Sequence, residues 1–163
     1  MEYQKEIKVF KAGLIGGDSF AGSNGLQNDI TIPEWIKLCE DNRQGKNLPD
    51  GYVPATTFIA IREYDRKMVG TIQIRHSFTP HLFSVGGHIG YMTAVDERRK
   101  GYCTEMLRLC LPYCKQELGI DKVLITCKKP NTASAKVIIA NGGVLENEVE
   151  HDGEIFQRYW IDV

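Results

Sequence analysis

A basic loop after an apolar stretch is the part of this sequence best suited to chemistry. It contains the run Arg98-Arg99-Lys100-Gly101, and an amphipathic segment over residues 104–118 follows and predicts a helix. The first N–H groups of a helix lack partners within it and its positive end attracts anions, so this loop is a candidate phosphate site. Gly101 suits the site because glycine adopts backbone angles closed to other residues. A solvated helix-entry loop without a ligand is the alternative.

The surrounding elements predict an α/β fold in one domain. Residues 89–95 and 122–127 read as buried strands, and the helix between them is long enough for a crossover, which makes the strands parallel. Hairpins over 57–74 and 144–161 add antiparallel strands. Further helices are expected over 31–42, after the capping-box pair Thr31 and Glu34, and over 133–141. The prediction is a mixed, largely antiparallel sheet with flanking helices.

Four motifs in the same order resemble the GNAT N-acetyltransferase superfamily. Residues 98–103 are similar to its acyl-CoA signature, (Gln/Arg)-x-x-Gly-x-(Gly/Ala), with Cys103 at the last position. The other three are Val69-Gly70 in the central hairpin, the helix opening Asn131-x-x-Ser134, and the closing corner Asn141-Gly142-Gly143. The similarity covers roughly residues 56–163. It implies one domain over 1–163, in which residues 1–55 form the acceptor side.

The resemblance implies an N-acetyltransferase that moves an acetyl group from acetyl-CoA to an amine by direct attack on the thioester. The amine would belong to a small molecule or a protein N-terminus. In the superfamily, the strand before the phosphate loop splays from its parallel neighbour and its backbone binds the pantetheine arm. The implied cofactor-binding residues here are Thr93, Ala94, Val95, Arg98, Arg99, Lys100, Gly101, Tyr102, Cys103, Thr104, Asn131 and Ser134. For Asn131 and Ser134, capping of the helix that they open is the alternative role.

The catalytic groups are harder to assign. Many members carry a Tyr four residues before the corner glycine, but Ile138 stands at that position, so the usual acid for the departing thiolate is absent. His88 is a candidate base because imidazole has an ordinary pKa near ~6.5, with packing at the strand start as the alternative. Candidate acids are Tyr91, Tyr102 and Tyr159.

Composition limits the class of protein. The 163 residues are 42% hydrophobic with a net charge of -1, which suits a domain with a real core and gives no footprint for nucleic acid. No apolar run approaches the ~20 residues of a membrane span, and the first residues lack a signal-peptide core. Five cysteines without a disulfide pattern favour a reducing, cytoplasmic setting and no metal centre. A homodimer stays open.

Two further expectations concern reactivity and alternatives. Cys103, beside cations at a helix start, is expected to have a lowered thiol pKa. The rival to an enzyme is a non-catalytic acyl-CoA-binding module with a GNAT-like fold. A flavin or nucleotide binder is a third reading, although the Gly-x-Gly-x-x-Gly fingerprint is missing. The sequence does not identify the acceptor amine.

Overall fold

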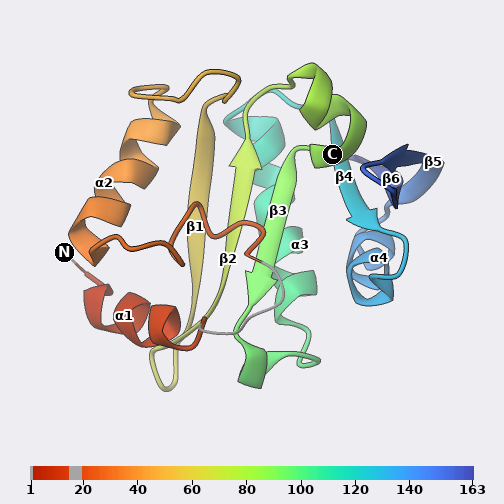
Figure 1. The fold of residues 1–163 in the computed structure, drawn as a ribbon. Helices are drawn as coiled ribbons and strands as arrows, with labels where there is room; N and C mark the ends of the chain where they lie inside the picture. Colours follow the sequence, from red (N-terminus) through yellow and green to blue (C-terminus); the bar gives the residue numbers. More distant parts are fainter. Residues whose placement is uncertain (1, 15–19) are drawn as a thin grey trace.

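The computed structural model describes residues 2–14 and 20–163, which build two three-stranded antiparallel sheets with helices around them (Figure 1). The first sheet has the order β1-β2-β3, with strands Ala55–Arg62, Lys67–Arg75 and Ile89–Thr93. The second has the order β4-β6-β5, where β4 is Lys122–Lys128, β5 is Val144–His151 and β6 is Glu154–Asp162. The helices are α1 (Gln4–Ala12), α2 (Ile32–Arg43), α3 (Tyr102–Gln116) and α4 (Thr132–Ala140).

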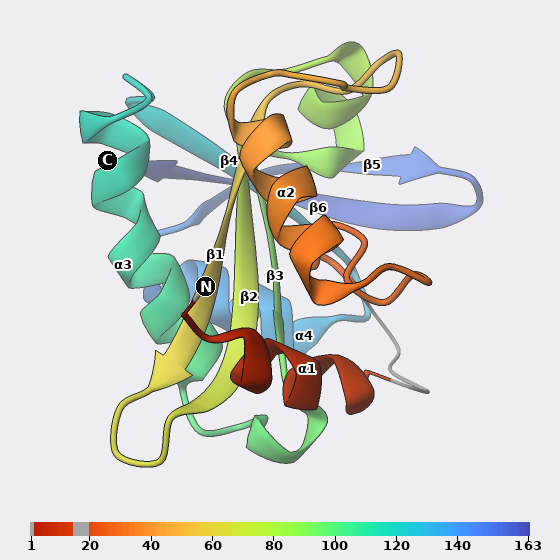
Figure 2. The same cartoon turned by 90° about the vertical axis from the view of Figure 1, so that its left-hand side faces the viewer.

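Helices cover both faces of the first sheet. Figure 2 shows α1 and α2 on one face and α3 on the other. The sequence alternation along β3 explains this: Ile89 joins the core under α3, whereas Met92 joins the core under α1 and α2. Ile138 of α4 and Ile125 of β4 belong to the α3 core, which therefore runs from the first sheet into the second.

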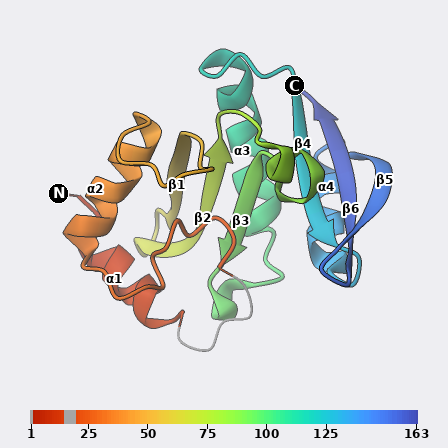
Figure 3. The same ribbon diagram turned by 45° about the horizontal axis from the view of Figure 1, so that its top comes forward.

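The two sheets meet where β3 and β4 begin. The His88 N–H donates to the Leu124 carbonyl (2.7 Å), and the Leu124 N–H donates to Nδ1 of His88 (2.9 Å). Gly87 is needed here, because its φ is +68° and a Cβ would lie 2.8 Å from the Leu124 oxygen. Beyond this junction each strand pairs within its own sheet and the two diverge (Figures 1 and 3). The predicted splayed parallel pair is confirmed.

Several local predictions need correction. The N-terminal third was expected to be irregular, but residues 4–12 form α1, whose short apolar stripe buries Ile7 and Phe10. The segment 78–87, which joins β2 to β3, contains a π-helical turn, η1 (Leu82–Gly86). Helix α3 begins at Tyr102 rather than at residue 104, so two predicted loop residues lie in its first turn. Of the predicted acceptor side, residues 1 and 15–19 lie outside the described part.

The described residues contain neither a membrane-spanning helix nor a cluster of metal-binding side chains. No helix in 2–14 or 20–163 is both long and apolar enough to cross a membrane. In the same part of the chain, no group of three or more His, Cys, Asp or Glu side chains could hold a metal ion. All five cysteines are free thiols, and Cys110 and Cys114 pack in the core as their helical spacing suggests.

Candidate functional site

The loop before α3 has the backbone shape expected of an anion site. Gly101 precedes the helix with φ at +84°, and Arg99 also adopts a left-handed conformation, with φ at +63°. A Cβ added to Gly101 would meet no described atom within 4 Å, so the loop is open at this point. Arg98 and Arg99 are exposed. The first-turn N–H groups of α3 therefore begin at an open, basic surface.

The end of β3 presents its backbone toward the splay. The Ala94 N–H donates to the Val69 carbonyl of β2 at 2.8 Å. Because successive N–H groups of an extended chain point in opposite directions, the Thr93 N–H points away from β2. This is the orientation that the predicted backbone contacts with a pantetheine arm require. The short 3-10 turn η2 (Val95–Glu97) then connects the strand to the loop.

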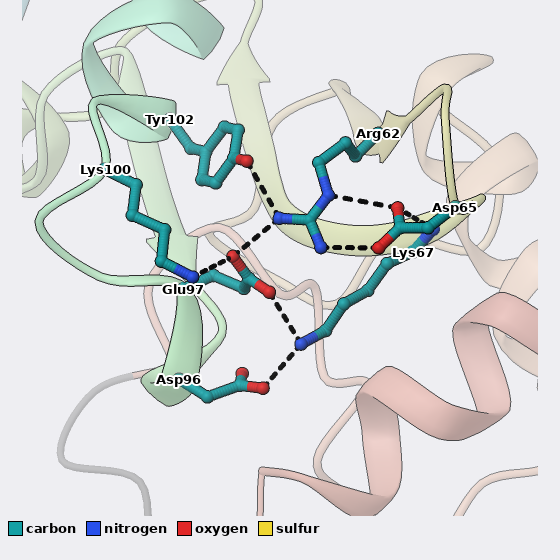
Figure 4. Close-up of polar contacts among 7 residues, drawn as sticks. All are labelled: Arg62, Asp65, Lys67, Asp96, Glu97, Lys100 and Tyr102. Carbon is teal, nitrogen blue, oxygen red and sulfur yellow. Dashed lines mark hydrogen bonds and ion pairs between the residues drawn. The ribbon is translucent and has the colours of Figure 1, made fainter.

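The buried carboxylate of Glu97 bonds to Lys100 and so fixes the loop before α3 (Figure 4). Glu97 is 3% exposed, and its Oε2 accepts hydrogen bonds from Arg62 Nη1 (2.8 Å) and Lys100 Nζ (2.9 Å). Its Oε1 accepts one from Lys67 Nζ (2.7 Å). Bonds from Lys67, Lys100 and Arg62 lower the pKa of Glu97 to about 2. The structure thus places Lys100, predicted to face phosphate, against a carboxylate.

The same cluster orients Tyr102. Arg62 makes a two-pronged ion pair with Asp65 (3.0 and 2.6 Å) and donates to the Tyr102 hydroxyl at 2.9 Å. Figure 4 shows the ring pointing to the β1–β2 hairpin. Sequence reasoning missed Glu97 and Arg62; only the Glu97–Lys100 spacing hinted at a local ion pair.

The prediction for Cys103 was wrong. Its side chain turns inward, where the thiol lies 2.7 Å from the Thr93 hydroxyl. Burial raises the pKa of the Cys103 thiol, and this outweighs the bond to Thr93 and the charge of Arg98. A cation nearby in sequence therefore does not activate a thiol that faces the interior.

At the start of α4, Asn131 caps the helix, whereas the Ser134 side chain contacts β3. Asn131 Oδ1 accepts from the Ser134 N–H at 3.2 Å, as an N-cap does. The Ser134 hydroxyl lies 2.7 Å from the Tyr91 hydroxyl of β3. Ile138 is fully buried, and a Cβ on Gly143 would lie 2.4 Å from its Cγ2. Ile138 thus fills the core beneath the closing corner.

The structure favours a supporting role for His88. Its ring is 5% exposed and stacks on Phe78 with centroids 3.9 Å apart, and its Nδ1 accepts the Leu124 amide. Burial, with a smaller effect of the Arg75 charge, lowers the pKa of His88 to about 4. The imidazole is therefore neutral at neutral pH, but the nitrogen that accepts a proton is already occupied.

The three predicted catalytic residues do not meet. His88 stands at the β3–β4 junction, Tyr102 points to the hairpin, and Tyr159 lies in β6. The Tyr159 hydroxyl donates to Gln157 at 3.0 Å, and burial raises its pKa. Each of these three side chains is engaged with partners of its own. The geometry therefore favours the backbone at Thr93 and Val95 and the loop before α3 as the functional site, rather than these three residues.

Replacing Glu97 by Gln tests the buried carboxylate. Because the folded-state pKa is depressed, Glu97 stabilises the protein above its ordinary pKa of 4.5, and this contribution is lost as pH falls toward about 2. We expect Glu97→Gln to lower the melting temperature at neutral pH. Between pH 4.5 and 2, the stability of the variant should fall less than the stability of wild type. Urea unfolding across this range measures both.

The matched control is Glu105→Gln, which breaks an exposed pair with Arg108 on α3. It should leave the melting temperature nearly unchanged, because exposed pairs contribute little. Equal stabilities of the Glu97 variant and wild type at neutral pH would show that the cluster does not stabilise the fold.

These features define the class of protein as an acyltransferase fold, with a splayed strand pair and an anion loop at its open end. Residues 27–144 match the family model described as acetyltransferase (GNAT) domain. The match spans most of the sequence, so the chain belongs to the GNAT family of acetyltransferases.

Solved structures agree on the fold. The ribosomal-protein-S5-alanine acetyltransferase from Vibrio fischeri superposes with a TM-score of 0.69 at 16% identity, covering 98% of this chain and 88% of that one. RimL, a ribosomal L7/L12 alpha-N-protein acetyltransferase in complex with coenzyme A, superposes with a TM-score of 0.66 at 17% identity, covering 98% of this chain and 90% of that one. A spermidine N-acetyltransferase SpeG chimera from Vibrio cholerae and hSSAT superposes with a TM-score of 0.58 at 15% identity, covering 81% of this chain and 77% of that one. At these identities the likeness is one of fold.

Proposed function

We propose that this protein is an acetyl-CoA-dependent N-acetyltransferase that acts on an amine of a small molecule or a protein N-terminus. The observation that carries the proposal is the end of β3, where the Thr93 N–H points away from β2 toward the splay, with the Val95 N–H following at the start of η2. That strand leads directly into the open loop before α3. One continuous stretch therefore offers donors for an amide-bearing arm and for a diphosphate.

The residues have separate tasks in this proposal. Acetyl-CoA is the donor substrate and supplies an activated acetyl group as a thioester. The first turn of α3, with Arg98 and Arg99 beside it, binds the diphosphate. The Thr93 and Val95 N–H groups align the arm and polarise the thioester carbonyl, which favours attack by an amine held close to it. Lys100 acts through Glu97 by fixing the loop.

The acceptor class rests on family membership and on the structural neighbours. These neighbours include ribosomal-protein and spermidine acetyltransferases, so both protein N-termini and polyamines belong in the test. A thiol-release assay should use acetyl-CoA with a panel of N-terminal peptides, polyamines and small amines. We expect release of CoA that depends on one acceptor class, and mass spectrometry should show the acetylated product.

The second candidate is a non-catalytic acyl-CoA-binding module. The buried Ile138, in place of the family's usual Tyr, favours it. Calorimetry with acetyl-CoA, run beside the thiol-release assay, separates the two: binding without turnover over the whole panel supports the module. Absence of binding would contradict both.

A further inference from the structure

The first sheet ends in a strand that has a neighbour on one side only. Within the part of the chain that the structure describes, β1 pairs with β2 alone. The Pro54 carbonyl, just before β1, accepts the His76 N–H at 2.8 Å, so the backbone at this point faces β2. Since the direction of the backbone groups alternates along an antiparallel strand, Phe58 also faces β2, whereas Thr57 and Ile59 face away from it. Their N–H and C=O groups therefore form the outer edge of the sheet.

Apolar cavities lie on both faces of this edge. On the α3 face, a cavity of about 610 Å³ extends from Phe58 and Ala60 of β1 to residues of α3 that include Leu109. On the opposite face, a smaller cavity of about 280 Å³ is lined by Ile59 and by Trp35 of α2. Figure 2 views the molecule from this side, with β1 between α3 and α2. An extended chain added to the edge would direct its alternate side chains into the two cavities.

The sequence of β1 does not protect this edge from pairing with another strand. Residues 56–61 contain no charged side chain and no proline, two of the devices by which edge strands avoid contact with other chains. Strand β5, the outer strand of the second sheet, differs because it carries Glu146, Glu148 and Glu150. These carboxylates would repel a second copy of β5, whereas a second copy of β1 meets no such charge.

The geometry points to a second copy of this chain as the partner at this edge, bound by antiparallel pairing of β1 with β1. A two-fold dimer requires a surface that is complementary to itself. Strand β1 meets this requirement, because Phe58 packs toward the α3 core and Ile59 toward the core under α1 and α2. Each copy thus offers apolar side chains for both cavities of the other. The pairing is independent of the acetyltransferase activity proposed above.

The register follows from the outward-facing residues. Thr57 exchanges hydrogen bonds with Ile59 of the second copy, so the two-fold axis passes between the two Phe58 residues, which lie opposite each other. The same register brings Tyr52, which precedes β1, toward Tyr64 of the second copy, which follows β1. Tyr52 is 69% exposed and Tyr64 is 81% exposed. The dimer would therefore cover aromatic surface at both ends of the paired strands, where interfaces are enriched in such side chains.

The pairing leaves the splay accessible. In the strand order β1-β2-β3, the free edge lies on one side of the first sheet, and the splay between β3 and β4 lies on the other (Figure 1). The two copies would thus join their first sheets into one, with a splay at each end. A substitution that separates the copies should therefore leave the fold and the loop before α3 intact.

Leu109→Arg tests the dimer by placing a charge in the path of the second strand. Leu109 lines the larger cavity and is 60% exposed, so the monomer should tolerate the change with an unaltered melting temperature. In sedimentation velocity over a concentration series, wild type should dimerise. The variant should show a dissociation constant about 100-fold higher, about tenfold for each of the two copies. Ile139→Arg on α4 is the matched control: Ile139 is 55% exposed, and its substitution should leave the dissociation constant unchanged.

Hydrogen exchange, followed for each amide by NMR, tests the edge itself. The Thr57 and Ile59 amides should exchange at least about 10-fold more slowly in the wild-type dimer than in monomeric Leu109→Arg, whereas the Phe58 amide, which faces β2, should be protected in both. Wild type that stays monomeric over the whole concentration series would overturn the proposal, and protected Thr57 and Ile59 amides in that monomer would show that a segment of the same chain covers the edge. A dimer in which both amides exchange fast would overturn it too, because another surface would then join the copies.

Discussion

Replacing Gly101 by Asp is expected to weaken acetyl-CoA binding by roughly 100-fold or more. The substitution puts a carboxylate where we propose that a diphosphate binds, and two lost charge-assisted contacts are worth about this factor. The space around Gly101 is open, so the effect arises from charge and backbone rather than from a clash. Calorimetry gives the affinity directly. The ligand-induced rise in melting temperature, present in wild type, should vanish in the variant.

Gly119→Asp is the matched control. Gly119 lies just beyond the other end of α3, also with a positive φ (+65°) and no described atom within 4 Å of an added Cβ. Both variants therefore carry similar backbone strain, of about 1–2 kcal/mol. Only the Gly101 variant should lose binding. Equal affinities of the two variants would show that the loop before α3 is not the anion site.

Replacing His88 by Ala is expected to destabilise the protein by about 3 kcal/mol. The change leaves the buried Leu124 amide without its acceptor and removes the ring that stacks on Phe78. His88→Asn is the rescue variant, because an amide oxygen can take the place of Nδ1. We expect it to recover part of the stability in urea unfolding.

The contribution of His88 to stability should decrease as the pH falls. The pKa of His88 is lowered from 6.5 to about 4 in the folded protein, so the unfolded chain binds more protons between these values. Stability from His88 is complete above 6.5 and declines as pH falls through this window, and His88→Asn should not show this decline. If His88→Ala is as stable as wild type but loses its rate at every pH, the residue is the base rather than a support.

The sequence was informative where structure depends on local pattern. The apolar run over residues 89–95 predicted β3, which the structure places at 89–93, and the glycine before an amphipathic segment predicted the loop and α3. The capping-box spacing predicted the start of α2, where Glu34 and Thr31 bond as expected. Each of these features is fixed by residues within one or two turns of chain.

Features that depend on distant partners were missed. Arg62 reaches Glu97 from the hairpin, 35 residues away, and Tyr91 reaches Ser134 across 43. The inward turn of Cys103 toward Thr93 depends on the orientation of α3 against β3, which neighbouring charges do not reveal. For His88, residue type suggested a base, and only the Leu124 contact showed the ring engaged in the junction.

Because β3 and β4 diverge, the two sheets are only weakly coupled to each other by backbone hydrogen bonds. The sheets share one narrow hydrogen-bonded corner at His88 and Leu124, and the α3 core runs behind both. On the proposed function, the amide-bearing arm of the donor supplies the missing strand between them. The substrate is then a removable part of the architecture: it joins two separately hydrogen-bonded units into one continuous sheet, and each product release separates them again.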